Sequence, residues 1–471
     1  MEFPARTALI EEFASSLSPL ELFAYFRRHP YAFFLDSAMD PAKLGRFSLM
    51  GGEPFLVLES RGTRLRIREN GVLREFEGNP LDEFGKGLDK YRLSKVPSPI
   101  PCAGAAVGYL SYDLRHFIER LPSRAVDDLA LPECCFCFYD RLLIRDNLDG
   151  ATYLVSTGFP DLEESPRQTR AGERLKELRS LLAHPVPVAS GEAAPASSRQ
   201  SPQSNFSHED YVKAVSRARQ YIIDGDIFEV NLSQRFESSL TLSPYELYVR
   251  LRKINPAPFA AFLDFPGSEV VCSSPERFLK LVGDRVETRP IKGTARRGAT
   301  PAEDRARAQE LLDSVKDRAE NMMIVDLERN DLGRVCRYGS VKVTELAILE
   351  TYPTLFHLTS TIVGQLKEGV GRIDLLKATF PGGSITGAPK VRSMEIIDEL
   401  EPTRRSVYTG SLGYLGFDGD LDLNIVIRTF LIKGGKAYFQ AGGAVVFDSD
   451  PESEYQETLD KARALFEALH V

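Results

Sequence analysis

The sequence predicts an α+β protein, a large mixed domain in which strands and helices are interleaved. Two observations carry this prediction. Short runs that are apolar, or that alternate between apolar and polar residues, recur between Gly, Asp and Asn turns, as β-strands do. Segments with helical periodicity lie among these runs, but at no regular period and without an internal repeat. This order disfavours a doubly wound fold or a barrel, in which strands and helices alternate regularly.

The N-terminal region, residues 1–183, is expected to be rich in strands. Its strand-like runs cover residues 31–37, 54–60, 63–69, 105–113, 134–146 and 151–157. Residues 147–150 read Asn-Leu-Asp-Gly between two of these runs, which is typical of a hairpin turn. A charged helical stretch from Pro166 to Leu182 ends the region.

One segment differs from the rest of the chain in composition. Residues 184–207 are rich in Pro, Ala and Ser and lack hydrophobic periodicity, which is typical of a linker or a long exposed loop. This linker-like loop separates the N-terminal region from a third region, residues 208–471.

Two helix starts in the third region are well marked. Ser207 and Asp210 form an S-x-x-D signature before an apolar helical face. Residues 300–303 read Thr-Pro-Ala-Glu, which combines a capping box with proline at the first helical position. We therefore expect one helix after residue 207 and a long helix from Thr300.

The remaining elements of the third region follow from the same criteria. Strands are expected at residues 228–236, 259–265, 269–274, 277–282, 408–417, 423–430 and 436–447. Helices are expected at residues 243–253, after a Gly-rich turn at 382–387, and at 451–469. Residues 289–300 are expected to form a loop.

Composition excludes several classes of function. The 471 residues carry 67 acidic and 59 basic side chains, a formal charge of -8 that argues against a nucleic-acid coat or a basic membrane-surface protein. No apolar run approaches the roughly 18 residues of a membrane span, and the first residues show no secretory signal. The six cysteines are too sparse for a disulfide scaffold, and the CCFC run is expected to be a buried strand. The expected compartment is the reducing cytoplasm.

Two pairs of acidic residues have helical spacing. Asp317 and Glu320 lie near the end of the helix expected from Thr300, and Glu454 and Glu457 lie near the start of the last helix, with Lys461 four residues further on. Spacings of three and four place side chains on one helical face. Converging carboxylates would hold a hard cation such as Mg²⁺. The alternative is that each pair lies on a solvated acidic helix face.

Two glycine-containing runs are candidates for ligand binding. Residues 381–390 are rich in small residues before a helix, so backbone N–H groups there could bind a carboxylate or a phosphate, or only form a tight turn. The run lacks the spacing of a phosphate-binding or a dinucleotide-binding loop. In Pro-Ile-Lys-Gly-Thr, Lys292 would become a nucleophile if burial lowered its pKa. The alternative for Lys292 is an exposed loop lysine.

Two further residues allow both a chemical and a structural interpretation. Glu276 follows a strand-like run, where it could be a general acid or an ion-pair partner for Arg277. His357 lies in an apolar stretch, which favours a buried histidine with its hydrogen bonds satisfied. No Ser-His-Asp or Cys-His motif appears.

Six motifs together resemble one enzyme family. SPERF, PIKGT, AENMMIVDLERNDLG, TFPGGSITGAPK, GDLDLNIVIRT and ESEYQETLDKA occur in this order between about residues 210 and 464. In this order and spacing they resemble the chorismate-utilising enzymes, and FFLDSAMDPAKLGRFSLMG extends a looser similarity into the N-terminal region. The resemblance implies two packed, mostly antiparallel β-sheets with helices outside. It also implies an inhibitor site, such as one for tryptophan, near Asp36 and Ser37.

Lys292 marks the branch of the family. PIKGT resembles the pattern of the aminodeoxychorismate synthases (component I), which serve folate and p-aminobenzoate biosynthesis, whereas anthranilate synthases, the alternative, usually have PIAGT. Glu229 departs from that branch, where glutamine is usual, and Ala444 stands where many relatives have glycine. Isochorismate and salicylate synthases have a lysine at the position of Glu229, so their activities are not expected.

The resemblance also implies roles for individual residues. Glu320 and Glu457 would hold Mg²⁺, supported by Asp317 and Glu454. Chorismate would be bound by Tyr408, Arg428, Gly442 and Lys461, in a pocket shaped by Gly293 and Thr294, with His357 near the departing hydroxyl. Glu276 would protonate the C4 hydroxyl, and Lys292 would attack C2 and form a covalent intermediate. Ammonia from a glutamine amidotransferase partner would then add at C4.

Overall fold

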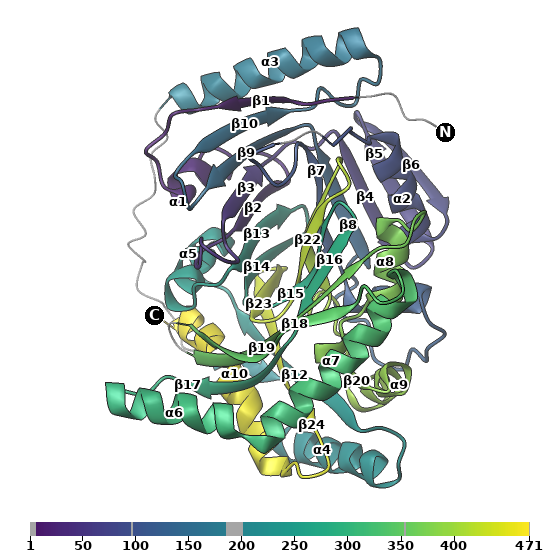
Figure 1. The fold of residues 1–471 in the computed structure, drawn as a ribbon, viewed down its shortest axis with the longest axis vertical. Helices are drawn as coiled ribbons and strands as arrows, with labels where there is room; N and C mark the ends of the chain where they lie inside the picture. The colour runs from purple at the N-terminus through teal and green to yellow at the C-terminus, as the bar shows by residue number, and fades with distance from the viewer. Residues whose placement is uncertain (1–5, 96–97, 185–200, 353–354, 471) are drawn as a thin grey trace.

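The strands form two large antiparallel sheets. The computed structural model describes residues 6–95, 98–184, 201–352 and 355–470. Within these ranges there are two sheets of 12 strands each, and all neighbouring strands are antiparallel. Helices accompany both sheets, so the predicted α+β class and its two antiparallel sheets are confirmed (Figure 1).

The first sheet runs through the upper left and the bottom of Figure 1. Its strands, in spatial order, are β1 (Leu9–Glu12), β10 (Thr152–Ser156), β9 (Arg141–Asp146), β3 (Phe47–Gly51), β2 (Ala32–Asp36), β13 (Phe259–Phe265), β14 (Ser268–Ser274), β23 (Thr429–Lys433), β24 (Lys436–Val445), β12 (Glu229–Ser239) and β11 (Gln203–Ser204), and β20 (Gly387–Ala388) also pairs with β12.

The second sheet holds the other strands. In spatial order they are β17 (Ile291–Arg296), β19 (Leu355–Gln365), β16 (Arg285–Arg289), β15 (Arg277–Val282), β22 (Leu421–Ile425), β21 (Ser411–Gly416), β7 (Ala105–Leu110), β8 (Cys134–Tyr139), β4 (Leu56–Arg61), β5 (Arg64–Glu69) and β6 (Val72–Glu77), and β18 (Lys342–Thr351) also pairs with β19.

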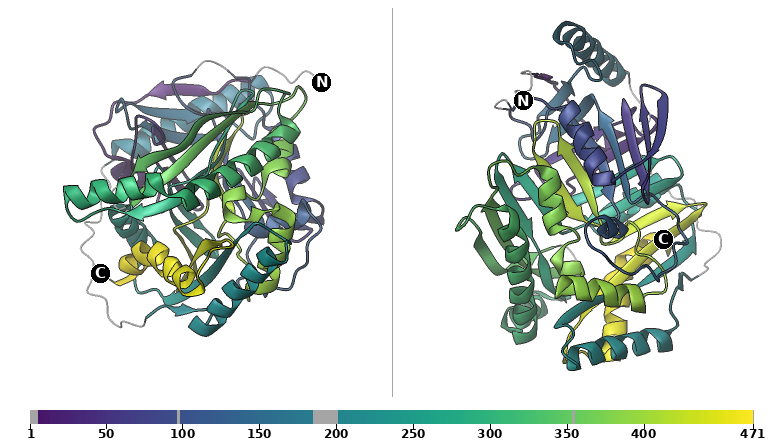
Figure 2. Two further views of the ribbon diagram at one scale, coloured as in Figure 1. Left: turned by 60° about the horizontal axis from the view of Figure 1, so that its bottom comes forward. Right: turned by 90° about the vertical axis from the view of Figure 1, so that its right-hand side faces the viewer.

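The helices pack against these sheets and against one another. Helix α3 lies along β1 and β10, α5 against β14, α9 and α4 against β12, α10 against β24, and α7 against β17 and β19 (Figures 1 and 2). Their bounds are α1 (Pro19–Phe23), α2 (Pro80–Lys90), α3 (Glu164–Ala183), α4 (His208–Ile223), α5 (Pro244–Ile254), α6 (Pro301–Asp313), α7 (Val315–Val335), α8 (Arg372–Thr379), α9 (Lys390–Leu400) and α10 (Pro451–His470). In the described residues, no helix combines the length and apolar character that a membrane span requires.

Each sheet contains strands from both the N-terminal and the third region. In the first sheet β2 pairs with β13, and in the second sheet β7 pairs with β21. The largest apolar cluster likewise joins Phe33, Phe138 and Leu423. The predicted division at residues 184–207 stays a prediction, because residues 185–200 lie outside the described residues.

Many predicted elements are confirmed by the structure. Ser207 and Thr300 cap α4 and α6 through their side chains, as their signatures predict. Residues 147–150 connect β9 to β10. The CCFC run lies in β8, where its thiols are buried and free.

Three predictions about elements were wrong, and all three concern segments that contribute residues to the cavity described below. Residues 289–300 are not a loop, because 291–296 form strand β17. The helix from Thr300 ends at Asp313, and Ser314 caps a new helix, α7, so Asp317 and Glu320 lie at a helix start. The expected strand at 423–430 is interrupted between β22 and β23, where Arg428 has a φ of 52°.

Candidate active site

A cavity of about 300 Å³ brings together most of the predicted site residues. Strands β12, β17, β19 and β24, helices α7 and α10, and the turn before β20 contribute to its walls, in the lower half of Figure 1. The predicted residues that line it are Glu276, Lys292, Gly293, Thr294, Asp317, Glu320, His357, Tyr408, Arg428, Gly442, Glu457 and Lys461. Glu454 is not among the lining residues.

Lys292 is buried and forms an ion pair. A register irregularity between Ile291 and Thr294 in β17 lets successive side chains of this strand reach the cavity. The Nζ of Lys292 donates to Oε1 of Glu229 at 2.5 Å, and both side chains are at most 7% exposed. Burial lowers the pKa of Lys292, but the carboxylates of Glu229 and Glu320 outweigh burial, and the pKa is raised. The condition set for a nucleophile, a pKa lowered by burial, is therefore not met, and the alternative of an exposed loop lysine was wrong, because Lys292 is buried in β17.

Glu276 has the environment of a general acid. It follows β14, where Oγ of Ser274 accepts a hydrogen bond from its backbone N–H. Its Oε1 accepts from Oγ of Ser384 at 2.5 Å and from the N–H of Ile291 at 3.3 Å. Burial raises the pKa of Glu276 to about 7, so its carboxyl is partly protonated near neutral pH.

The alternative interpretation of Glu276, as the ion-pair partner of Arg277, does not hold in the structure. Arg277 donates instead to Asp422 and Glu287. Both hydrogen bonds that the described residues give Glu276 go to Oε1, so Oε2 is left to interact with a ligand in the cavity.

The two acidic pairs meet across the cavity from different helices. Oδ2 of Asp317 accepts from Oγ of Ser314, the cap of α7, at 2.5 Å. On α10, Glu454 accepts from Oγ of Ser449 at 2.6 Å, and Glu457 pairs with Lys461 at 2.6 Å. Figure 2 (left) shows the yellow C-terminal helix α10 facing the green helices α6 and α7.

Lys316 connects the two helices. Its Nζ lies 3.9 Å from Oε1 of Glu320 and 3.9 Å from Oε1 of Glu454. In the parts of the chain that the structure describes, no three acidic, histidine or cysteine side chains form a preassembled metal site. The physical reason is that Asp317, Glu454 and Glu457 are each engaged by a neighbouring hydroxyl or ammonium group. The role of the four carboxylates as metal ligands stays a prediction.

The chemistry of these carboxylates nevertheless fits a hard cation. Oε1 of Glu320 and Oε2 of Glu454 are buried and have no hydrogen-bond partner within the described residues. Burial raises the pKa of both carboxyls, to about 7 for Glu320, because desolvation outweighs the nearby lysine charges. Mg²⁺ prefers carboxylate oxygens and would supply the missing partner. By contrast, burial would raise the pKa of Glu457, but Lys461 brings it below its usual value.

Arg428 and His357 form a polar pair in the wall. Nη2 of Arg428 donates to Nε2 of His357 at 3.2 Å, and Nδ1 of His357 lies 2.9 Å from Oγ1 of Thr294. Because arginine only donates, Nε2 must accept, and the imidazole is neutral with its proton on Nδ1. Burial, then the charge of Arg428, lowers the pKa of His357 well below its usual range. His357 is thus buried with both nitrogens satisfied, as the sequence favoured.

Arg428 is a cation without an anion. Within the described residues no carboxylate forms an ion pair with it, and burial lowers its pKa to about 10. A partly buried guanidinium that lines a cavity is suited to bind a ligand carboxylate with two N–H donors. This geometry agrees with the role that the resemblance implies.

Tyr408, Gly442 and Lys461 also line the cavity. Nζ of Lys461 donates to the carbonyl oxygen of Gly442 at 3.0 Å as well as pairing with Glu457. A Cβ at Gly442 would lie 2.6 Å from the carbonyl oxygen of Leu232, so glycine is required for β24 to pair with β12 here. Burial raises the pKa of Tyr408, which therefore keeps its phenolic proton.

Sequence reasoning missed several polar residues of the cavity. Asn231, Ser384 and Gln440 line it, and Glu229, noted only as a departure, is the partner of Lys292. Ser384 lies in the Gly-rich run, so its position in the sequence could have identified it as a cavity residue. The run contributes Ser384 and Ile385 to the cavity, whereas the opening of α9 at Pro389 does not line it.

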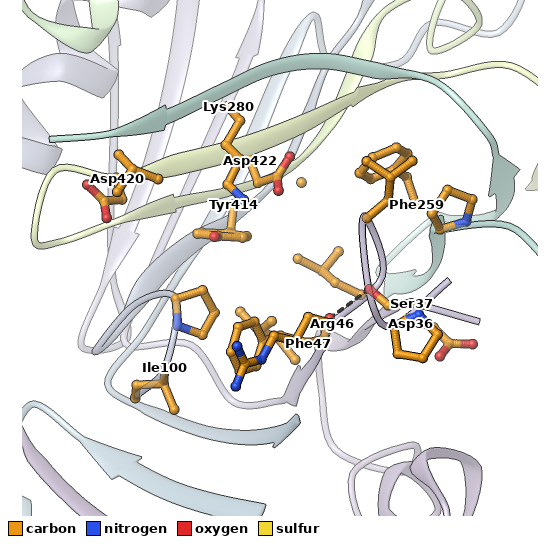
Figure 3. A pocket seen from close by; sticks show the side chains of 18 of the residues that line it. Asp36, Ser37, Arg46, Phe47, Ile100, Phe259, Lys280, Tyr414, Asp420 and Asp422 are labelled. Carbon is orange, nitrogen blue, oxygen red and sulfur yellow. Dashed lines mark hydrogen bonds between the residues drawn. The ribbon is translucent and has the colours of Figure 1, made fainter. Parts of the chain in front are cut away.

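A second, larger cavity of about 850 Å³ lies between the sheets (Figure 3). Phe47 comes from the first sheet, and Tyr414 and Asp422 from the second, and all three face this space. Asp36 of the first sheet also borders it, but its carboxylate points away and accepts from Tyr248 and Arg252. It coincides with the region around Asp36 and Ser37 in which the resemblance implies an inhibitor site. Its use by a ligand stays a prediction.

Comparisons with known proteins agree with this geometry. A family model described as chorismate binding enzyme matches residues 53–467. Aminodeoxychorismate synthase component 1 of Bacillus subtilis (strain 168) is 39% identical over 460 residues, 97% of this chain and 95% of that protein. Anthranilate synthase component 1 of Acetivibrio thermocellus is 40% identical over 465 residues, 98% of this chain and 94% of that protein.

The solved structures show the same similarity. The crystal structure of anthranilate synthase component I from Streptococcus pneumoniae TIGR4 superposes with a TM-score of 0.79 at 33% identity, covering 91% of this chain and 93% of that one. Family model, relatives and fold agree over nearly the whole chain. The chain belongs to the family of chorismate-utilising enzymes.

Proposed function

We propose that the chain is component I of an aminodeoxychorismate synthase, which converts chorismate and ammonia to 4-amino-4-deoxychorismate. Lys292 carries the proposal, because its amino group is buried at the wall of the cavity and has a single carboxylate partner. Anthranilate synthases usually have alanine at this position, which offers no nucleophile. Relatives of both kinds are about equally similar to the chain, so overall similarity does not choose between the two activities, and the proposal rests on position 292.

Binding of chorismate follows from the cations of the cavity. Chorismate carries two carboxylates, and the guanidinium of Arg428 and the ammonium of Lys461 both offer positive charge in the cavity. Mg²⁺, when held by the carboxylates of α7 and α10, supplies positive charge for the ring carboxylate and for the bond that breaks at C4.

The first chemical step uses Glu276 and Lys292. Hydroxide is a poor leaving group, so Glu276 donates its proton to the C4 hydroxyl. The neutral amine of Lys292 attacks C2, the two ring double bonds shift (C1=C2 to C1=C6, and C5=C6 to C4=C5), the C4–O bond breaks and water leaves. The chain is then bonded to C2 of the ring through Lys292.

The second step reverses these movements. Ammonia attacks C4, both ring double bonds shift back, and the bond between C2 and Lys292 breaks. The carboxylate of Glu276 takes a proton from the new C4 ammonium group. The enolpyruvyl group is retained, and Lys292 has blocked C2, the position at which ammonia adds in anthranilate synthesis.

Ammonia is proposed to come from a glutamine amidotransferase partner, with the chain working in the cytoplasm. The experiment that tests the proposed activity is product analysis by mass spectrometry after incubation with chorismate, Mg²⁺ and an ammonium salt, with a control that omits ammonium. The proposal expects a product that keeps the enolpyruvyl group. Aromatic anthranilate as the only product would overturn it and establish the alternative, anthranilate synthase component I.

A further inference from the structure

The ion pair of Lys292 poses a question of proton transfer. An ammonium group has no lone pair, so Lys292 must lose a proton before it can attack carbon. Its pKa is raised, because the carboxylates of Glu229 and Glu320 outweigh the effect of burial. The resting amine is therefore charged, and a nearby group has to accept its proton.

Glu229 is placed to accept that proton. Its side chain is fully buried, and its Oε1 lies 2.5 Å from Nζ of Lys292. Its Oε2 is buried without a hydrogen-bond partner among the described residues. A carboxylate that serves only to stabilise the fold would be expected to have both oxygens satisfied.

The Gly-rich run holds Glu229 in this place. A Cβ at Gly387 would lie 2.1 Å from the backbone carbonyl oxygen of Glu229, so only glycine fits there. The same carbonyl accepts a hydrogen bond from Oγ of Ser393 at 2.9 Å. Residues 387–388 form β20, which pairs with the first residues of β12. The run thus fixes the backbone that carries the carboxylate.

A second lysine–carboxylate pair in the chain shows the contrast. Nζ of Lys390 donates to Asp331 at 2.5 Å, and also to the carbonyl oxygens of Thr379 and Pro381 at 2.9 and 2.8 Å. Its three donors are used, and neither residue lines the 300 Å³ cavity. Lys292 makes one hydrogen bond to the described residues and lines the cavity. The hydrogen bonds of Lys390 indicate a structural role, and those of Lys292 do not.

We propose that Glu229 is the catalytic proton acceptor for Lys292, the reacting amine of the function proposed above, on which this inference rests. The proton passes from Nζ to the carboxylate of Glu229, which leaves a neutral amine and a neutral carboxyl. The amine forms the bond to C2 while Glu276 protonates the departing hydroxyl. When ammonia displaces the lysine, the neutral amine is released and takes its proton back from Glu229. Every proton is accounted for at the end of the cycle.

This transfer has a consequence for pH dependence. With Glu229 present, the proton only moves from Lys292 to Glu229, and the pair holds the same number of protons before and after. Bulk pH therefore does not control this transfer. Without the carboxylate, Lys292 must lose its proton to solvent, and the rate of attack rises about tenfold per pH unit below the pKa of the amine. The other ionisable groups that face the pair are Glu276, Glu320, Glu457 and Lys461, which remain the same in both proteins.

The test compares wild type with Glu229→Gln, which keeps the size and a hydrogen bond but cannot accept a proton. Each protein is mixed with chorismate and Mg²⁺ without ammonia between pH 6.5 and 9, and the covalent adduct is followed by quenched-flow intact-mass spectrometry. The result is expressed as the ratio of the adduct-formation rate of the variant to that of wild type. In this ratio the pH dependence that comes from ionisable groups present in both proteins cancels. Asp331→Asn, in the structural pair, is the matched control, and thermal unfolding and chorismate binding verify folding.

The expected ratio for Glu229→Gln is about 0.01 at pH 7 and rises with pH, while the ratio for Asp331→Asn stays near one. A ratio near one at every pH, a faster variant, or a slowing that is independent of pH would each overturn the role of Glu229. Glu229→Asp keeps a carboxylate and is expected to give a reduced but flat ratio; a rising ratio would also contradict the inference. An absent adduct in wild type would instead refute the proposed function.

Discussion

At the scale of single residues, the environments of Glu276 and Lys292 assign them opposite roles. Burial raises the pKa of Glu276 to about 7, so a fraction of its carboxyl keeps a proton near neutral pH. The pKa of Lys292 is raised, so the role proposed for its amine requires the loss of a proton first. When the environments of two ionisable groups push their pKa values apart, one commonly serves as the acid and the other as the base.

The raised pKa of Glu276 predicts a pH profile. Its acid form is present below a pH of about 7 and is lost as the pH rises through that value, so kcat/KM is expected to fall on the alkaline side. Glu276→Gln is expected to lower the rate by about 10²–10⁴-fold and to remove this alkaline limb. Steady-state assays between pH 5.5 and 9 measure both effects. Glu269→Gln, on the preceding strand and outside the cavity, is the control, and an unchanged limb in Glu276→Gln would contradict the assignment.

Removing the nucleophile changes rate and product. Lys292→Ala is expected to slow aminodeoxychorismate formation by about 10³-fold or more, because the covalent route is lost. Some flux is expected to reach C2, since no side chain blocks ammonia there. The measurement is the rate and the ratio of the two amination products, with Lys436→Ala at an exposed pair as control. The same rate and product as wild type would refute covalent catalysis.

Single-residue properties were only partly predictable from the sequence. The motif around Lys292 indicated a nucleophile, and burial does lower its pKa as expected, but the net shift is upward because of nearby carboxylates. The reason is that Glu229 lies 63 positions away in the chain, and only the packing of β12 near β17 places its carboxylate beside the amine. A residue's charge state depends on such long-range neighbours, which spacing in the sequence does not reveal.

At the scale of elements, the break between α6 and α7 organises the carboxylates. Ser314 ends one helix and caps the next, and its hydroxyl fixes Asp317 at 2.5 Å. Glu320 follows one turn later with a buried oxygen that has no hydrogen-bond partner among the described residues. The start of α7 thereby points acidic side chains toward α10.

This arrangement predicts the effect of one substitution on metal binding. Glu320→Gln removes a charge from the proposed ligand set, so the Mg²⁺ concentration for half-maximal activity is expected to rise by about tenfold or more. Calorimetric titration of Mg²⁺ in the presence of chorismate provides a readout independent of turnover. Glu310→Gln, exposed on α6, is the matched control. Identical Mg²⁺ titrations for Glu320→Gln and wild type would remove Glu320 from the site.

Helices that begin with a capping residue were predictable from the sequence. Strands whose conformation depends on pairing with distant strands were not. Caps at Ser207 and Thr300 fixed the starts of two helices, because a cap needs only neighbouring residues. Strand β17 was mistaken for a loop, since Gly293 interrupts its pattern and its order comes from pairing with β19. The break around Arg428 was missed for the same reason: its φ of 52° is imposed by two strands that belong to different sheets.

At the scale of the whole molecule, one site is assembled from distant parts of the chain. The cavity draws residues from Asn231 to Leu465, although both sheets also contain strands of the N-terminal region. The family motifs predicted which residues would converge, and the sheets explain how they do. The net charge of -8 did not indicate an anionic ligand, because the charge of a cavity depends on its own side chains, here including Arg428 and Lys461.

The source of ammonia is testable at this scale. A glutaminase needs a reactive thiolate, whereas all six cysteines of this chain are buried. We therefore expect product with ammonium salts and no product with glutamine, unless a glutamine amidotransferase is added. Product quantification under the three conditions checks this. Glutamine-dependent turnover by the chain alone would contradict it.

The covalent bond to Lys292 is the central claim, and peptide mapping tests it most directly. The wild-type chain is mixed with chorismate and Mg²⁺ in the absence of ammonia, quenched and digested, and the peptide that contains Lys292 is sequenced by mass spectrometry. The account predicts an added mass of chorismate less one water on Lys292, which disappears when ammonium is supplied. No adduct, or an adduct on another residue, in a preparation that forms product would contradict it.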